Sequence, residues 1–338
     1  MKRFALLLLA VCLLLPGCRT APEQKKYNAT YLTLFDTVTT IVGFAESEEA
    51  FAAQAQKIHD DLLVYHQLFD IYNDYDGVSN LKTINDNAGI APVQVDEKII
   101  LLLKDCKSYY AFTGGKVNAA MGSVLQLWHE ARNDGINDPA NAYLPDADAL
   151  AEAANHIDPD SIIIDEAAST VYLADPETRL DVGAVAKGWA AEAVAEAAPE
   201  GLLISVGGNV CATGPKDATG TPWVVGIENP DGGDYLHTIY VSSGSIVTSG
   251  DYQRAYAVDG KVYHHIIDPV TLDPSSYWRS VTIVCEDSAL ADALSTALFL
   301  LPLEAGSALL ETAEAEAMWV DADGNIYYSK NFQALIRT

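Results

Sequence analysis

The chain has 338 residues, of which 49% are hydrophobic, and a formal net charge of −27. This length and apolar content are enough for one large domain, or two interleaved ones, with a substantial core. The strong negative charge argues against nucleic acid as a partner, because such a surface repels phosphate backbones and anionic lipid headgroups. An anionic phosphate ligand would therefore need an accompanying cation in order to bind.

The first residues predict export. A basic start at residues 1–3 precedes an apolar run, residues 4–15, that is too short to span a bilayer as a stable helix. Leu15-Pro16-Gly17-Cys18 is typical of a lipoprotein cleavage box, in which Cys18 becomes the lipidated first residue of the mature chain. A plain secretory signal is the alternative.

Cleavage at this box divides the chain into a signal peptide (1–17), a lipidated polar tether (18–30) and a single domain (31–338). We expect the domain to be anchored to the cell membrane by lipid, on the extracytoplasmic face. Within it the cysteines are odd in number and lie in apolar stretches, which argues for core residues and against a disulfide framework or a metal site: Cys106, Cys211 and Cys285.

The first half of the domain predicts one strand and several helices. Residues 31–44 are rich in Val, Ile and Thr, as strands are. Residues 46–69 and 97–112 carry apolar residues at helical spacing, and Asp96 is a plausible N-cap for the second helix. Residues 71–85 between them form a polar, turn-rich loop.

The second half predicts mostly sheet. Residues 129–160 are acidic and Ala-rich and predict a surface excursion with one short helix, and residues 161–174 predict a hairpin. Residues 201–210 predict a buried strand that ends in Gly-Gly, with Asn209 in the left-handed conformation of a tight turn. Two further strands, 223–230 and 237–241, are expected to continue the sheet.

Two segments carry residues suited to a phosphate and a cation. Residues 180–189 place Gly183 and Lys187 where a helix begins, and a helix N-terminus with a nearby charge favours phosphate, although the spacing is not that of a P-loop. Asp292 and Thr296 are four residues apart, so they share one helix face and could offer oxygen ligands to Mg²⁺. The alternative is a helix-stabilising charge with a back-bonded threonine.

Residues 249–269 contain a predicted hairpin between two polar motifs. Ser249-Gly250-Asp251-Tyr252 with Arg254 precedes it, and Tyr263 with His265-Ile266-Ile267-Asp268-Pro269 ends it. These motifs resemble S-G-D-Y-x-R and Y-x-H-I-I-D-P of the periplasmic flavin transferases once called thiamine-biosynthesis lipoproteins. Further motifs in the same order strengthen the resemblance: N-x-A-M-G-S-V-L at 118–125, L-D-V-G-A-x-A-K-G at 180–188 and A-D-A-L-S-T at 291–296.

The resemblance covers roughly residues 31–330 and implies an α+β fold: a mixed, largely antiparallel sheet with packed helices, with FAD in a cleft between two interleaved lobes. It also implies Mg²⁺-dependent transfer of FMN from FAD to a Thr or Ser hydroxyl of an exported protein, releasing AMP. The implied acceptors are subunits of flavin-based electron-transfer systems. Hydrolysis of FAD to FMN and AMP, or simple FAD binding by a lipoprotein, are the rival functions.

The resemblance also assigns residues. Those implied to contact FAD are Phe35, Tyr72, Ala120, Met121, Gly122, Asp181, Lys187, His265 and Ile267. Tyr72 belongs to a loop that would lie over the flavin ring, and the alternative is an ordinary surface loop. The implied Mg²⁺ ligands are the Ala184 carbonyl, Asp292 and Thr296, and Ser295 stands where the family often has a second Asp. The candidates for general base are His265, Asp268, Asp181 and Asp251.

Five other histidines show no metal-ligand spacing, so we interpret them as surface or satisfied core residues: His59, His66, His129, His156 and His237. We expect His264, next to His265, to face outward.

Overall fold

The computed structural model describes residues 24–337. The predicted signal peptide and Cys18 lie outside these residues. Within them, no helix has both the length and the apolar character needed to cross a membrane.

The chain forms fifteen strands and eight α-helices over the described residues. The strands are β1 Lys25–Leu34, β2 Thr37–Ala45, β3 Val93–Gln94, β4 Ile162–Asp165, β5 Thr170–Leu173, β6 Leu202–Val206, β7 Asn209–Ala212, β8 Trp223–Ile227, β9 His237–Val241, β10 Gly244–Gly250, β11 Ala255–Val258, β12 Lys261–His264, β13 Ser280–Cys285, β14 Ala315–Val320 and β15 Ile326–Tyr328. The helices are α1 Glu48–Phe69, α2 Leu81–Asp86, α3 Glu97–Phe112, α4 Gly122–Asn137, α5 Ala147–Ala153, α6 Ala186–Ala197, α7 Ser288–Phe299 and α8 Leu303–Leu310.

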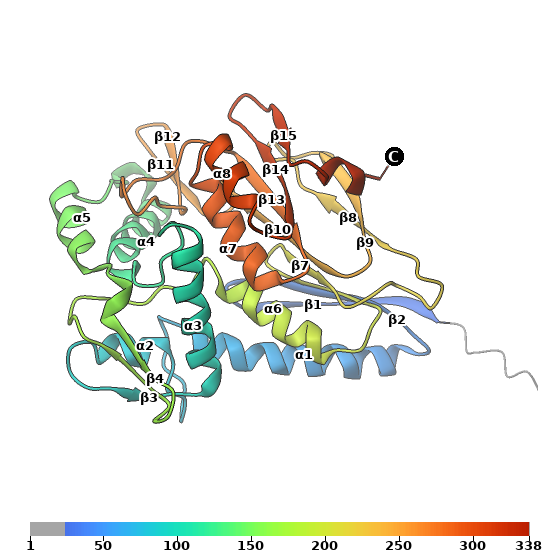
Figure 1. Ribbon diagram of the computed structural model, residues 1–338, viewed down its shortest axis with the longest axis horizontal. Helices are drawn as coiled ribbons and strands as arrows, with labels where there is room; N and C mark the ends of the chain where they lie inside the picture. Colours follow the sequence, from blue (N-terminus) through green and yellow to red (C-terminus); the bar gives the residue numbers. More distant parts are fainter. Residues whose placement is uncertain (1–23, 338) are drawn as a thin grey trace, which may run out of the picture.

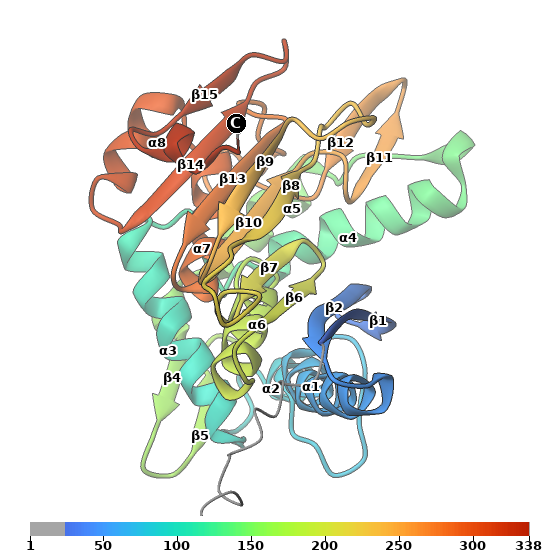
Figure 2. The ribbon, with the colours of Figure 1, turned by 90° about the vertical axis from the view of Figure 1, so that its right-hand side faces the viewer.

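An eight-stranded sheet in the order β1-β2-β6-β7-β10-β13-β14-β15 forms the centre of the molecule, and every neighbouring pair is antiparallel. Helices α1, α6 and α7 cover one face of this sheet (Figure 1). Strands β8 and β9 form a separate two-stranded sheet on the opposite face (Figure 2). The predicted largely antiparallel α+β architecture is therefore confirmed.

A second group of elements lies beside the sheet and supplies the other wall of the site. Helices α2 and α3 pack with the β3-β5-β4 sheet around a buried apolar cluster that includes Leu81, Ile99, Leu103, Val171 and Leu173. Helix α4 packs against the β11–β12 hairpin (Figure 1). The predicted helix 97–112 is confirmed with its Asp96 N-cap, whose carboxylate accepts from the Lys98 amide at 2.9 Å.

Several predicted elements differ from the structure. The single strand 31–44 is wrong, because Phe35 and Asp36 form a tight turn with φ of 53° and 51° that splits it into β1 and β2. Residues 25–30, assigned to the tether, lie in β1. The region 129–160 begins with a continuation of α4, which ends only at Asn137.

The second half of the chain also brings corrections. Strands β8 and β9 do not continue the main sheet. The left-handed positions of the β6–β7 turn belong to Gly207 and Gly208, with φ of 59° and 90°, whereas Asn209 begins β7. Since glycine has no Cβ, it takes this conformation without the steric cost that asparagine pays.

Helices α6 and α7 approach each other closely at Gly188. A Cβ built on this residue would collide with the Ser288 carbonyl oxygen and lie 2.6 Å from the Asp292 Cβ. The absent side chain lets the Gly188 amide donate to the Asp292 carboxylate at 2.9 Å. Glycine at this position therefore sets the separation of the two helices.

We expect Gly188→Ala to lower the free energy of unfolding by about 1–3 kcal/mol, because the methyl group overpacks a tight helix contact. Urea unfolding measures this change. Gly306→Ala in α8 is the matched control, since its nearest contact would be Leu298 Cδ2 at 3.3 Å and alanine favours the helix. An equal loss in both variants would contradict the close-approach explanation.

Candidate active site

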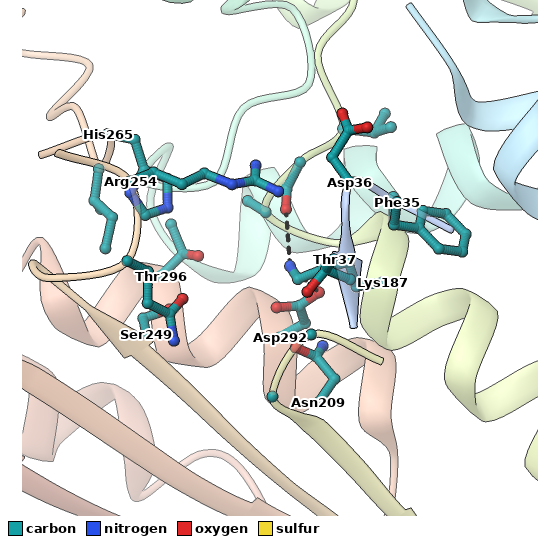
Figure 3. A pocket seen from close by; sticks show the side chains of 18 of the residues that line it. Phe35, Asp36, Thr37, Lys187, Asn209, Ser249, Arg254, His265, Asp292 and Thr296 are labelled. Atoms are coloured by element: carbon teal, nitrogen blue, oxygen red, sulfur yellow. Dashed lines mark hydrogen bonds and ion pairs between the residues drawn. The ribbon is translucent and has the colours of Figure 1, made fainter. Parts of the chain in front are cut away.

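A cavity of about 740 Å³ lies between the main sheet and the β11–β12 side of the molecule, and segments far apart in sequence form its walls. They include the β1–β2 turn, the loop after α1, the segment before α4, the start of α6, the β6–β7 turn, part of β8, the end of β10, the segments before β11 and after β12, and one face of α7. Figure 3 shows its side chains from close by. This volume suits a ligand of dinucleotide size.

The wall formed by α6 and α7 centres on Asp292. Its side chain is buried, and one carboxylate oxygen, Oδ2, accepts from the Gly188 amide at 2.9 Å. The Lys187 ammonium lies 3.5 Å from the same oxygen and 3.4 Å from the Gly183 carbonyl. Lys187 and Asp292 face one another in Figure 3. The amide and the ammonium together offset the cost of burying this carboxylate.

Thr296 lies one turn after Asp292 and also borders the cavity, as does Ala184. Within residues 24–337, neither the Thr296 hydroxyl nor the second Asp292 oxygen has a protein hydrogen-bond partner. These oxygens are the donor type that Mg²⁺ takes, with few carboxylates from the protein. No cluster of three His, Cys, Asp or Glu side chains suited to a metal occurs in the described part.

Ser295 is engaged in the helix and is not a free ligand. Its hydroxyl donates to the Asp292 carbonyl at 2.8 Å, and the Ser249 hydroxyl lies 2.8 Å from the Ser295 oxygen. Because the Ser295 hydroxyl proton is used in the bond to the carbonyl, the Ser249 hydroxyl donates to the Ser295 oxygen. This contact joins the end of β10 to α7.

His265 faces the cavity from the segment after β12. Burial lowers the pKa of its imidazole well below the usual value, and the nearby charges of Arg254 and Lys187 act in the same direction. Its Nδ1 is buried and has no partner among the described residues. Arg254 extends from this side toward Lys187 in Figure 3, and within residues 24–337 it pairs with no carboxylate.

Asp181 and Met121 come together through backbone pairing. The Asp181 amide donates to the Ala119 carbonyl at 2.9 Å, and the Gly122 amide donates to the Arg179 carbonyl at 2.9 Å. Met121 and Asp181 border the cavity. Ala120 and Gly122 do not: Ala120 is fully buried, and Gly122 is needed because a Cβ would collide with Arg179. Contact of these two residues with a ligand therefore stays a prediction.

Two of the four candidates for general base are occupied elsewhere. Asp268 pairs with Lys116 at 2.7 Å and caps the following turn through the Val270 amide at 2.7 Å. Asp251 pairs with the Arg279 guanidinium at 2.9 Å. Neither borders the cavity, whereas His265 and Asp181 do.

The structure corrects the interpretation of one histidine, His264, and places two others at the cavity. His66 and His129, expected on the surface or satisfied in the core, both border the cavity. His129 Nδ1 lies 2.8 Å from the Tyr72 hydroxyl, and its Nε2 lies 4.0 Å from Asp181 Oδ2. His264, expected to face outward, is buried, and its Nε2 lies 2.7 Å from the Ser275 carbonyl. Because strand residues alternate, burying His264 places His265 on the other side.

The remaining predicted contacts Phe35, Tyr72, Lys187 and Ile267 all border the cavity. Sequence reasoning missed other parts of the wall: Asp70, Lys116, Asn209, Gly226 and Glu228. The turn signal of Gly207-Gly208 was the one available clue to Asn209. The β8 residues carried none, because only their placement as a separate sheet brings Gly226 and Glu228 to the site.

Comparison with known proteins gives one consistent result. The model of the ApbE family matches residues 35–319. A protein of Treponema pallidum called FAD:protein FMN transferase is 36% identical over 77% of this chain and 75% of its own length. A protein of the same description from Klebsiella pneumoniae is 32% identical over 80% of this chain and 86% of its own length.

Solved structures agree on the fold. The crystal structure of the ApbE protein from Thermotoga maritima is similar with a TM-score of 0.82 and 30% identity, covering 93% of this chain and 100% of that one. The flavin transferase ApbE from Vibrio cholerae is similar with a TM-score of 0.75, covering 93% of this chain and 100% of that one. At 21% identity, this similarity shows the fold alone.

The lowered pKa of His265 predicts a pH dependence of stability. Between the folded pKa and the unfolded value near 6.5, the unfolded chain binds a proton that folded His265 does not, so acidification destabilises the fold by up to about 1.4 kcal/mol per pH unit. We expect His265→Gln to flatten the decline in the free energy of unfolding below about pH 6.5, measured by urea unfolding.

His156→Gln is the control, because it should change the pH dependence of the free energy of unfolding in the opposite direction. A hydrogen bond to Asp175 at 2.7 Å raises the pKa of His156, so its stabilising contribution is present at low pH and is lost as pH rises. Removing it should steepen the decline between the raised folded pKa of His156 and about pH 6.5, and leave the slope below about pH 6.5 unchanged. Equal slopes in the wild type and His265→Gln would contradict the burial of a neutral His265.

Proposed function

The chain belongs to the ApbE family, and on that premise we propose that it transfers FMN from FAD to a Thr or Ser hydroxyl of an exported protein, releasing AMP. The observation that carries this proposal is the cavity itself. It joins an aromatic region at Phe35 and Tyr72 to a polar region at Lys187, Asp292 and Thr296. A flavin ring suits the first region and a pyrophosphate the second.

The polar region supports an answer to the charge conflict that the sequence posed. A pyrophosphate entering a chain of net charge −27 meets the Lys187 ammonium and the N-terminal end of α6. Asp292, Thr296 and the Ala184 carbonyl would hold Mg²⁺ beside it, and the ion would supply neutralisation of the phosphate charge and polarisation of the bridging bond. The free oxygens of Asp292 and Thr296 support this assignment.

The proposed reaction exchanges one phosphorus–oxygen bond for another. The acceptor hydroxyl oxygen attacks the phosphorus of the FMN half, the bond to the bridging oxygen breaks, and AMP leaves with that oxygen. The hydroxyl proton passes to a general base. Of the sequence candidates, His265 and Asp181 border the cavity, so one of these two takes it in our proposal. Burial lowers the pKa of His265 and keeps its ring neutral, and its Nδ1 has no partner among the described residues.

Membrane attachment and the choice of partner extend the proposal. Lipidation of Cys18 would hold the domain at the extracytoplasmic face, where exported subunits of flavin-based electron-transfer systems are the acceptors. The sequence of residues 1–18 supports this location. Incorporation of labelled palmitate into the wild type, and its loss in Cys18→Ala, would test the anchor.

We expect the domain from residue 24 onward, incubated with FAD, Mg²⁺ and an exported flavoprotein domain, to add one FMN to that acceptor by mass spectrometry. Asp292→Asn should lower the transfer rate at least about a hundredfold, since it removes charge at the reacting phosphates. Asp273→Asn is the control, because this exposed carboxylate lies outside the cavity.

The same assay separates the rival activities. Free FMN and AMP beside an unmodified acceptor would indicate a hydrolase, with water in place of the acceptor hydroxyl. FAD bound but never cleaved, with Mg²⁺ present, would indicate a binding protein and would contradict the proposal.

A further inference from the structure

One hydrogen-bonded chain connects two turns of the cavity wall that are separate in sequence. It begins at the backbone of Phe35, passes through the side chains of His66, Tyr75 and Asp70, and ends at the backbone of Tyr72. Phe35 and Tyr72 are the aromatic residues assigned to the flavin ring. His66 and Tyr75 have no part in the reaction proposed above.

The distances define each link. The Phe35 amide donates to His66 Nδ1 at 3.2 Å, and His66 Nε2 lies 3.3 Å from the Tyr75 hydroxyl oxygen. The Tyr75 hydroxyl donates to Asp70 Oδ2 at 2.7 Å. The other Asp70 oxygen accepts from the amides of Tyr72 at 2.6 Å and Asn73 at 3.1 Å.

Donor chemistry fixes the direction of every bond. A backbone amide can only donate, so His66 Nδ1 must carry a lone pair, and the neutral ring then bears its proton on Nε2. A carboxylate can only accept, so the Tyr75 proton points to Asp70 and its oxygen accepts from His66 Nε2. Burial raises the pKa of Tyr75 to about 12, with Asp70 adding to the effect, so its proton is retained at neutral pH. All groups are satisfied in one arrangement only.

At its Phe35 end, the hydrogen-bonded chain supports a backbone turn of unfavourable conformation. Phe35 and Asp36 have φ of 53° and 51°, a left-handed conformation that residues with a Cβ adopt rarely. His66 supports it twice, through the bond to the Phe35 amide and through an edge-on ring contact with centroids 5.6 Å apart. Such a conformation persists only where neighbouring contacts enforce it.

We propose that His66, acting with Tyr75, is a positioning residue that holds the Phe35–Asp36 turn and the Tyr72 turn at a fixed separation, so that the wall for the flavin ring is formed before FAD arrives. The inference rests on the proposed function, since it assumes that the ring binds against Phe35 and Tyr72. It predicts a loss confined to the flavin half of FAD. The phosphate region at Lys187 and Asp292 belongs to other elements, α6 and α7.

Calorimetric titration with two fragments of FAD tests this directly. Riboflavin probes the ring region, and ADP with Mg²⁺ probes the phosphate region together with the adenosine part of the site, without the ring. We expect His66→Phe, which keeps a ring but removes both nitrogens, to weaken riboflavin and FAD binding about tenfold, the size of one lost hydrogen bond. ADP binding should change less than about twofold.

Four further variants sharpen the result. His66→Asn places an amide oxygen near the position of Nδ1, so it should recover part of the riboflavin affinity. As a single variant, Tyr75→Phe should also weaken riboflavin binding. Combined with His66→Phe it should cause no further loss, because both substitutions break the same hydrogen-bonded chain. His156→Phe is the control, since that histidine also bonds to a carboxylate, Asp175, but lies outside the cavity.

The outcomes are distinct. Equal weakening of riboflavin and ADP would mean general destabilisation and would overturn the inference, as would unchanged riboflavin binding in His66→Phe or additive losses in the double variant. Wild-type protein that binds neither riboflavin nor FAD would overturn the proposed function, and this inference with it. Wild-type binding with unaffected variants would overturn the inference alone.

Discussion

The site depends on the contact between the Gly188 amide and the buried Asp292 carboxylate. It joins the start of α6 to the middle of α7, and the absent side chain at Gly188 is what lets the two helices meet. From this contact, the remaining Asp292 oxygen, the Thr296 hydroxyl and the Lys187 ammonium all face one part of the cavity. The amide and the ammonium together offset the cost of burying this carboxylate.

The rest of the cavity is arranged around that charged centre. The main sheet supplies the turns at Phe35 and Gly207, and the segment after β12 supplies His265 from the opposite side. Bonds between elements keep these parts in place. The Asn85 side chain exchanges hydrogen bonds with the Leu180 backbone at 3.1 and 2.6 Å, directly before Asp181. A rigid support of this kind is what preorganised binding of a large ligand requires.

Local patterns in the sequence predicted those parts that local physics decides. The i, i+4 spacing of Asp292 and Thr296 and the N-cap at Asp96 are set within one helix, and the structure has both. Asp251 and Asp268 could not be excluded in advance, because their partners Arg279 and Lys116 are brought to them only by the folded chain. His66 was interpreted as a surface or core residue for the same reason, since its link to Phe35 crosses between elements.

The strand order of the main sheet has a consequence for how the protein matures. Strand β2 pairs with β6, with Thr39 opposite Val206, and the cavity draws on residues from Phe35 to Leu300. Closing so long a loop is entropically costly, so pairings of this kind form late and fold slowly. A chain that is synthesised from its N-terminus therefore has no complete cavity until α7 has emerged. Only the completely folded domain can therefore bind the ligand, and a bound dinucleotide then stabilises that domain by mass action.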